Sequence, residues 1–194
     1  KISDFNNFNE FLSYLKENAS KISLTQQGKL IQIKGVSHAS SNLQDADVAE
    51  RQAKAAEISL SHYKCPISIQ TEYSDTLSLG SGVTFWAIFS LKKDEIDVKN
   101  PIRLGADALG ERGKKAEVVG KEAALMLARE IESKVPVDVH LADQLLPIMA
   151  LVGNSRIKTS KITNHAKTNI YTIEKFLEKT FSIDESNNII SAIN

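Results

Sequence analysis

The chain alternates between short stretches typical of β-strands and longer stretches with the spacing of an amphipathic helix, and this alternation restricts its fold class. Pro66 to Glu72 and Val83 to Ser90 have the strand pattern, and a loop ending in Gly80-Ser81-Gly82 separates them. Ala46 to His62 and Lys115 to Ser133 have the helical spacing. We therefore predict an α/β (α+β) protein with mixed strands and helices.

The N-terminal part of the chain is predicted to add a helix and a β-hairpin. Apolar residues recur at helical spacing from Phe5 to Asn18. Ser20 to Thr25 and Lys29 to Val36 alternate as strands do, and the Gln27-Gly28 pair between them suits a turn. Two strands joined by so short a turn are expected to pair with each other. Asp45 is the expected N-cap of the helix that follows them.

A change of pattern near Lys134 predicts a boundary between two structural units. Pro136 ends the segment of the long helix, and the remaining residues have the pattern helix, short strand, helix and strand. The expected strands are Arg156 to Thr159 and Phe181 to Ile183, with Asp184 to Asn188 turning into a final strand. We assign residues 1–19 to a connector, 20–134 to a first domain and 135–194 to a second.

Composition excludes several classes of protein. Of the 194 residues, 42% are hydrophobic, which is enough for a packed core and argues against disorder. No apolar stretch approaches a membrane span, and no basic segment followed by an apolar one opens the chain. Cys65 is the single cysteine, so an internal disulfide is excluded and a cytoplasmic location is the default. We expect Cys65 to be a buried structural thiol.

The charge balance bears on nucleic-acid binding. Lysine and arginine together number 24, and so do aspartate and glutamate. A protein that coats a duplex usually has a basic excess, which argues against a general nucleic-acid binder here. Recognition of one RNA end through a few phosphate contacts would not require that excess.

Two polar clusters at the edges of apolar helical stretches are the strongest candidates for a functional site. Residues three and four apart share one face of a helix, so the members of each cluster project together. A helix that begins with such a face suits a phosphorylated ligand. The clusters are His140, Asp143 and Gln144 in the first helix, and His165, Thr168 and Asn169 in the second. The apolar residues of the second helix that are available for the core are Ile170, Ile173, Phe176 and Leu177.

Each cluster also has a purely structural explanation. Asp138 would cap the first helix, with polar residues filling its first turn. His165 would be a partly buried histidine that caps the second helix beside Thr163 and Asn164. Spacing alone leaves both explanations open. A zinc site formed by the two histidines is not indicated, because no third ligand lies at a suitable spacing.

A third candidate is the stretch from Gly105 to Lys115, in which glycines precede basic residues at the start of a helix. Such a loop could bind phosphate, or it could be a solvated turn. Arg112, Lys114 and Lys115 would be the cations that guide RNA. The same two interpretations apply to three cations further along the chain, namely Arg156, Lys158 and Lys161. Trp86 lies in an apolar strand and is expected to be core.

Several longer segments resemble the RNA 3'-terminal phosphate cyclase family. The resemblance runs from about Lys29 to Phe181 and includes HLADQLLPIMAL, RIKTSKITNH and TNIYTIEKFL near the C-terminus. Upstream it includes Gly35 to Ala56, Gly80 to Ala87 and Gly105 to Ala124. The resemblance implies that residues 20–134 are the insert domain of a cyclase and that 135–194 are the last repeat of its large catalytic domain.

The family's activity supplies expected roles for the polar clusters. The resemblance implies ATP-dependent conversion of an RNA 3'-phosphate to a 2',3'-cyclic phosphate, by a ligase whose histidine becomes adenylylated. His165 would be that catalytic histidine, with Thr168 and Asn169 as supporting residues. His140 would lie near the base of ATP, and Asp143 and Gln144 near its sugar and phosphates. The implied ATP-binding segment is His140, Leu141, Ala142, Asp143 and Gln144.

Two family patterns do not occur in this sequence. The family has an N-terminal glycine-rich segment with Glu, Gln and Arg, and a Pro-x-Gly-Gly-Gly stretch, whereas no Gly-Gly pair occurs here. We therefore expect a C-terminal fragment, inactive alone, whose partners are the N-terminal half of the enzyme, ATP and RNA; a homodimer is also considered. The Mg²⁺ or Mn²⁺ ligands are expected outside this chain. The alternative is a non-catalytic, cyclase-like RNA-binding or ribosome-assembly factor.

Overall fold

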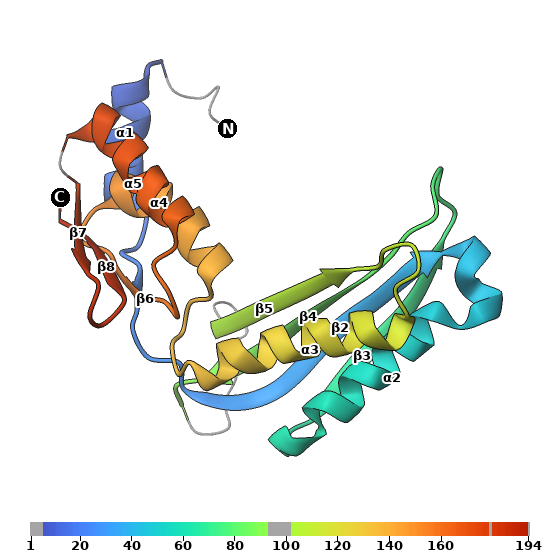
Figure 1. Cartoon of the computed structure of the whole chain (residues 1–194). Helices are drawn as coiled ribbons and strands as arrows, with labels where there is room; N and C mark the ends of the chain where they lie inside the picture. The colour runs from blue at the N-terminus through green and yellow to red at the C-terminus, as the bar shows by residue number, and fades with distance from the viewer. Residues whose placement is uncertain (1–5, 93–101, 179, 194) are drawn as a thin grey trace. The chain divides into compact units, whose positions relative to one another are not determined.

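The computed structural model describes residues 6–92, 102–178 and 180–193, without the side chains of Phe8, Leu12 and Lys16. The chain forms two compact units, each with its own sheet (Figure 1). Gln27–Lys134 form the central unit, and Lys1–Gln26 with Val135–Asn194 form the terminal unit. Helices and mixed parallel and antiparallel strands confirm the predicted α/β class.

The central unit is a four-stranded mixed sheet with two helices. Its strand order is β3-β2-β4-β5, in which β2 is parallel to β3 and β4 is antiparallel to both β2 and β5. Helix α2 connects the two parallel strands, and α3 follows the edge strand β5. The bounds are β2 Lys29–Ser40, α2 Val48–Leu60, β3 Ile67–Ser74, β4 Ser81–Ser90, β5 Ile102–Leu109 and α3 Ala116–Glu132.

Alternation along the strands directs one face of this sheet into the core. Ile33, Phe85 and Leu104 are fully buried, while Lys34, Thr84 and Arg103 next to them are exposed. Because successive side chains of a strand point to opposite faces, the buried set forms one surface, which α2 and α3 cover. Trp86 belongs to the opposite surface and is half-buried, so it is not a core residue of the kind we expected.

Helices α2 and α3 approach closely because small residues line their contact. Ala49, Ala53 and Ala56 of α2 are buried, as are Gly120 and Ala123 of α3. A Cβ atom on Gly120 would lie 2.0 Å from the backbone oxygen of Gln52, well inside van der Waals contact. The glycine is therefore required by the separation of the two helix backbones.

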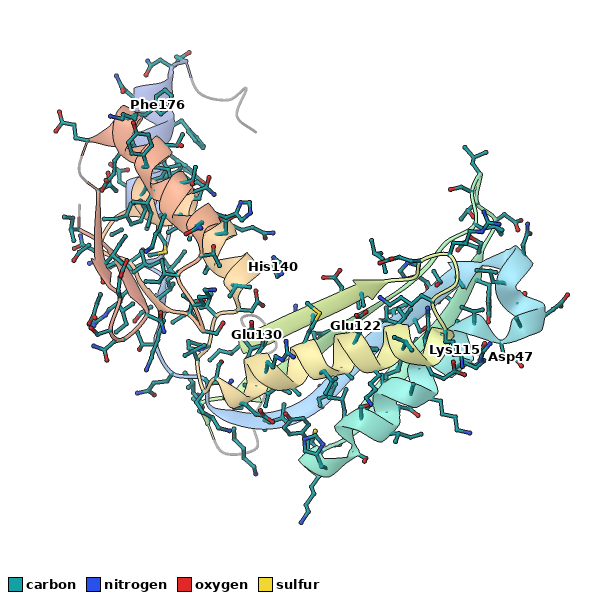
Figure 2. The ribbon with its side chains drawn as sticks, viewed as in Figure 1. Asp47, Lys115, Glu122, Glu130, His140 and Phe176 are labelled. Atoms are coloured by element: carbon teal, nitrogen blue, oxygen red, sulfur yellow. The ribbon has the colours of Figure 1, made fainter. Side chains whose placement is uncertain are left out.

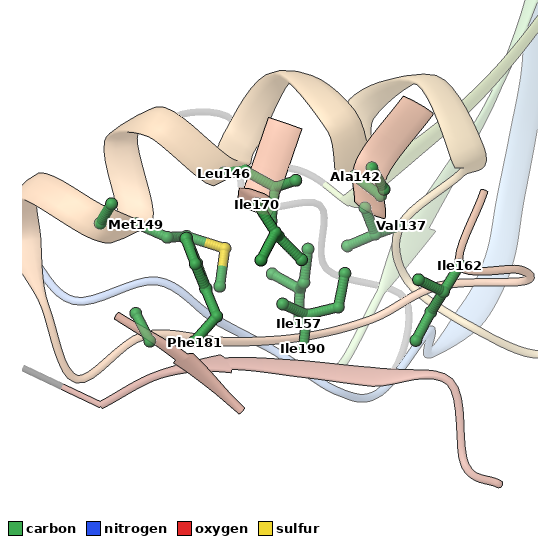
Figure 3. Packing of buried hydrophobic residues seen from close by; sticks show 12 residues of the cluster. Val137, Ala142, Leu146, Met149, Ile157, Ile162, Ile170, Phe181 and Ile190 are labelled. Atoms are coloured by element: carbon green, nitrogen blue, oxygen red, sulfur yellow. The ribbon is translucent and has the colours of Figure 1, made fainter. Parts of the chain in front are cut away.

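The terminal unit combines a four-stranded sheet, in the order β1-β6-β8-β7, with helices α1, α4 and α5. Leu146 and Met149 of α4 and Ile170 of α5 pack over Ile157 and Ile190 of the sheet (Figure 3). Burial of these apolar side chains holds both helices against the same sheet. The bounds are α1 Phe8–Asn18, β1 Ser23–Leu24, α4 Val139–Val152, β6 Arg156–Lys158, α5 Asn164–Leu177, β7 Phe181–Asp184 and β8 Ile189–Ala192.

The predicted hairpin between residues 20–25 and 29–36 is wrong. β1 pairs in parallel with β6, where the Arg156 N–H donates to the Ile22 carbonyl at 2.7 Å. β2 instead pairs with β3 and β4. Gly28 between β1 and β2 has φ +81, and a Cβ there would lie 2.3 Å from the Ser90 oxygen. The chain thus passes the end of β4 at Gly28, and residues 20–26, which we assigned to the first domain, lie in the terminal unit.

Two smaller predictions also need correction. A short 3-10 helix, Ser41–Ala46, precedes α2, so Asp47 and not Asp45 occupies the N-cap position, with φ 49. Phe176, which we placed among the core residues of α5, is 83% exposed. The buried stripe of α5 contains Ala166 and Ile170, and a position one residue away from such a stripe turns by about 100° toward solvent.

In the described residues, no helix is both long and apolar enough to cross a membrane.

Replacement of Gly120 by alanine is predicted to destabilise the central unit. Alanine favours a helix over glycine by about 1 kcal/mol, but overpacking a close contact costs about 1–3 kcal/mol. Because the contact is with backbone, the clash should dominate, and we expect a lower midpoint of urea unfolding. Leu125→Ala, at an exposed position of α3, is the control and should change stability by less than about 0.5 kcal/mol. A Gly120→Ala protein as stable as the original would contradict the packing described.

Candidate functional site

The first turn of α4 is fixed by a buried N-cap. Asp138 is 7% exposed, and its Oδ1 accepts hydrogen bonds from the His140 N–H at 3.0 Å and the Leu141 N–H at 2.8 Å. The predicted cap is therefore confirmed. His140 itself is exposed at this end of the helix (Figure 2). The cap orders the backbone that carries His140 and leaves its imidazole accessible.

The first turn of α5 is built in a similar way. Thr163 is the N-cap, and its Oγ1 accepts a hydrogen bond from the Ala166 N–H at 3.1 Å. His165 is exposed, and its imidazole forms no hydrogen bond with another residue in the described ranges. The interpretation of His165 as a partly buried capping histidine is thus wrong, because threonine performs that task. The imidazole of His165 is free to meet a ligand.

One hydrogen bond joins the two polar clusters. Asn169 of α5 donates through Nδ2 to Asp143 Oδ1 of α4 at 2.8 Å, and both side chains are half-buried. Asp143 lies three residues after His140, and Asn169 lies four residues after His165, so each histidine is about one helical turn from this bond. The structure therefore places the two clusters at one location.

The other predicted site residues differ in their surroundings. Gln144 is exposed, Leu141 is half-buried and Ala142 is packed in the core. Thr168 is exposed, and its hydroxyl donates to the Asn164 carbonyl at 2.9 Å. The Thr168 hydroxyl hydrogen is thus held within α5, whereas Asn169 reaches α4. Asn169 is therefore the supporting residue with a contact across the site.

Pro147 removes one main-chain hydrogen bond of α4 at Asp143. It lies inside α4, four residues after Asp143. Because proline has no N–H, it cannot donate the usual helical hydrogen bond to the Asp143 carbonyl. The side chain of Asp143 thus contacts Asn169. Its main-chain carbonyl does not receive the hydrogen bond that the residue four positions later usually donates in a helix.

Comparison with known proteins identifies the family. The family model described as "RNA 3'-terminal phosphate cyclase (RTC), insert domain" matches residues 25–132, which are more than half of the chain and nearly all of the central unit. The chain belongs to the RNA 3'-terminal phosphate cyclase family. The family predicted from the sequence is therefore confirmed.

Curated relatives carry the name RNA 3'-terminal phosphate cyclase. The protein from Pyrococcus abyssi is 48% identical over 160 residues, covering 82% of this chain and 43% of the relative. The relative from Methanosarcina acetivorans is 43% identical over 159 residues, covering 82% of this chain and 40% of its own length. The one from Pyrobaculum aerophilum is 48% identical over 160 residues, covering 81% and 43%. The chain thus spans about two-fifths of the length of these cyclases.

The other candidates for chemistry are Cys65, which is distant in sequence from both histidines, and three cations that precede His165 by four to nine residues. Cys65 is half-buried, and burial raises the pKa of its thiol, which disfavours the reactive thiolate. Arg156 is exposed on β6, and its charge helps lower the pKa of Asp184, although hydrogen bonds from Asn187 contribute more. Lys158 is half-buried and Lys161 is exposed.

Clustered metal ligands are absent from the part of the chain that the structure describes. Residues 6–92, 102–178 and 180–193 contain no group of three or more His, Cys, Asp or Glu side chains placed to hold a metal ion. Divalent cations such as Mg²⁺ take several oxygen ligands. That the ligands of Mg²⁺ or Mn²⁺ lie outside this chain stays a prediction.

The contact between Asp143 and Asn169 could not be read from either helix alone. The sequence placed Asp143 beside the ligand and Asn169 beside the imidazole, but it did not predict that they bond to each other. A weak signal was present, because each residue lies about one helical turn after a histidine. Only the packing of α4 against α5 shows that the two side chains meet.

Loss of the Asp138 cap is predicted to weaken the terminal unit. Asp138→Ala should lower its free energy of unfolding by about 1–2 kcal/mol, since two N–H groups of the first turn lose their acceptor. Asp138→Asn retains an acceptor oxygen and should recover most of the loss. Urea unfolding monitored by circular dichroism gives both values. Equal destabilisation by the two substitutions would show that the carboxylate has a role other than capping.

Proposed function

We propose that the protein containing this chain converts RNA 3'-phosphate ends to 2',3'-cyclic phosphates with ATP, and that His165 carries AMP as a covalent intermediate. Membership of the cyclase family supports the reaction class. The observation that carries the residue assignment is the exposed imidazole of His165, one turn from the bond between Asn169 and Asp143.

His165 suits nucleophilic attack on phosphorus. A neutral imidazole has a nitrogen lone pair near pH 7, and histidine is among the side chains that form covalent catalytic intermediates. The N-terminal end of a helix has a partial positive charge that favours the approach of phosphate groups. His165 is the second residue of α5, so a triphosphate beside it would lie at such an end.

The proposed reaction has three steps. His165 first attacks the α-phosphorus of ATP, so that a P–N bond forms and the P–O bond to the leaving pyrophosphate breaks. An oxygen of the RNA 3'-phosphate then attacks the same phosphorus, the P–N bond breaks, and the RNA ends in an anhydride with AMP. Finally the neighbouring 2'-hydroxyl loses its proton and attacks the RNA phosphorus, which releases AMP and leaves the cyclic phosphate.

The first helix would hold the nucleotide. His140 is exposed in the first turn of α4 and can stack on or bond to the base, while Gln144 offers both a donor and an acceptor to the sugar. Asp143 is held by Asn169 and can accept from a ribose hydroxyl through its second oxygen. These contacts would orient ATP for attack by His165, and orientation alone can supply several kcal/mol of catalysis.

Adenylylation of His165 can be tested in a protein of the relatives' full length that includes this chain. Incubation with ATP labelled on the α-phosphate should label the protein through a bond that is labile in acid and stable in alkali, as expected for P–N. His165→Ala should abolish both the label and cyclisation, because no nucleophile remains. His140→Ala is the matched histidine control and should raise the ATP concentration needed without preventing labelling.

Two results would contradict the proposal in different ways. Label retained in His165→Ala would place the nucleophile elsewhere. No label in the unsubstituted protein, although it binds RNA, would favour the alternative of a non-catalytic cyclase-like binding factor.

A further inference from the structure

A pocket of about 650 Å³ lies in the central unit, far in sequence from His165. It is bordered by the start of β4, the beginning of α2 and the Gly110–Lys115 segment that precedes α3. Its volume is in the range of pockets that bind small molecules, and it is larger than a single phosphate needs. All of its lining residues belong to the central unit, so the pocket is complete within that unit.

The base of the pocket is held in place by buried hydrogen bonds. The Gly110 N–H donates to the Ser81 carbonyl at 2.8 Å, and a Cβ on Gly110 would lie 2.2 Å from Ser81 Oγ. Gln52, which is fully buried, donates through Nε2 to Ser81 Oγ at 2.9 Å. The glycine therefore allows the loop to lie directly on β4, and the pocket is preformed.

Four cationic side chains line the pocket, and two of them already have acidic partners. Arg51 forms two hydrogen bonds with Glu117, at 2.8 Å and 3.0 Å, which raise the pKa of Arg51 and lower that of Glu117. Lys114 forms an ion pair with Glu122. These pairs fix the positions of Arg51 and Lys114 and neutralise most of their charge.

Arg112 and Lys115 are the cations that remain for a ligand. Both are exposed, and neither forms an ion pair with any residue in the described ranges. Lys115 occupies the N-cap position of the 17-residue helix α3 and lies at its end in Figure 2; it provides no side-chain cap. The partial positive charge of the helix end adds to two side-chain charges that form no ion pair, although the charge of Lys115 contributes to lowering the pKa of Glu117 after the larger effect of its hydrogen bonds with Arg51. Glu111 is the one acidic residue among the residues that line the pocket.

Three of the residues that line the pocket are large and apolar. Leu43 and Val48 are half-buried there, and Leu79 is 66% exposed. A ligand with an apolar surface that covered these side chains would remove apolar area from water, which is favourable. A nucleotide has such a surface in its base and a negative charge in its phosphate, whereas inorganic phosphate has only the charge.

We propose that this pocket binds one nucleotide unit of the RNA substrate, upstream of the end that reacts. The backbone phosphate would lie against Arg112, Lys115 and the first turn of α3, and the base would cover Leu43 and Leu79. The proposal rests on the proposed RNA substrate. It gives the central unit the task of holding the RNA strand while the terminal unit performs the chemistry. A single preformed pocket also agrees with a chain that has no overall basic excess.

The test is equilibrium binding of a fluorescent, single-stranded RNA to the 194-residue chain, measured by anisotropy without ATP. Arg112→Gln with Lys115→Gln should weaken binding about tenfold at low salt. It should also reduce the slope of log affinity against log salt by about 0.7, the value for one lost phosphate contact with a single strand. The control pair, Lys54→Gln with Arg129→Gln, also removes one lysine and one arginine charge, but from exposed positions of α2 and α3 outside the pocket. It should leave affinity within about twofold.

The base contact is tested with an abasic oligonucleotide of equal length and charge. It should bind the unsubstituted chain several-fold more weakly than the RNA does, and Leu79→Ser should remove that difference. Equal effects of the two charge-removing pairs, equal binding of abasic and normal strands, or no saturable binding at all would each overturn the proposal. Because neither ATP nor His165 enters the measurement, these outcomes are distinguishable from failure of the adenylylation mechanism.

Discussion

The candidate site depends on the packing of α4 and α5 over one small sheet. Leu146, Met149 and Ile170 bury their side chains against Ile157 and Ile190, and this contact determines where the polar ends of the two helices lie. The bond from Asn169 to Asp143 forms at the edge of that apolar contact. A half-buried polar pair costs little when its hydrogen bond is made and considerably more when one partner is lost. The apolar core thus brings the helices together, and the polar pair sets their register at the site.

In the central unit, small residues and not large apolar ones determine where the polar side chains lie. Gly120 and the alanines of α2 let two helices approach closely, which positions Gln52 beneath Ser81. Gly110 then allows the loop before α3 to lie on β4. Small residues therefore build the base of the cation-lined pocket, whereas large apolar residues position the histidines of the terminal unit. In both units, the packing of the core thus determines where the polar side chains of the candidate site lie.

Local sequence patterns were sufficient for most elements but not for strand pairing. Periodicity located α2 and α3 to within a few residues and predicted two further helices after residue 134. Asp138 was predicted as a cap because capping depends on adjacent residues. The hairpin prediction was wrong because the partner of β1, at Arg156, is more than a hundred residues away. Pairing at that separation depends on the whole fold and has no local signature. The short turn at Gly28 was compatible with either outcome.

In the candidate site, too, the sequence predicted groupings within one helix but not contacts between helices. Family resemblance supplied the expected roles of His140 and His165, and helical spacing grouped each with its neighbours. Neither could predict that Asn169 bonds to Asp143, because that contact depends on the angle and depth at which two helices pack. The exposure of Phe176 was missed for a related reason, since one residue of offset on a helix separates core from surface.

The central claim is that Asp143 and Asn169 act as one unit in forming the site of His165. A double-mutant cycle on the rate of protein–AMP formation, in a full-length protein that includes this chain, tests it most directly. Asp143→Ala and Asn169→Ala should each slow the reaction, and the double variant should be little slower than the slower single variant. Losses that multiply, so that the double variant is slowed by the product of the two single effects, would show that the residues act independently and would contradict this account.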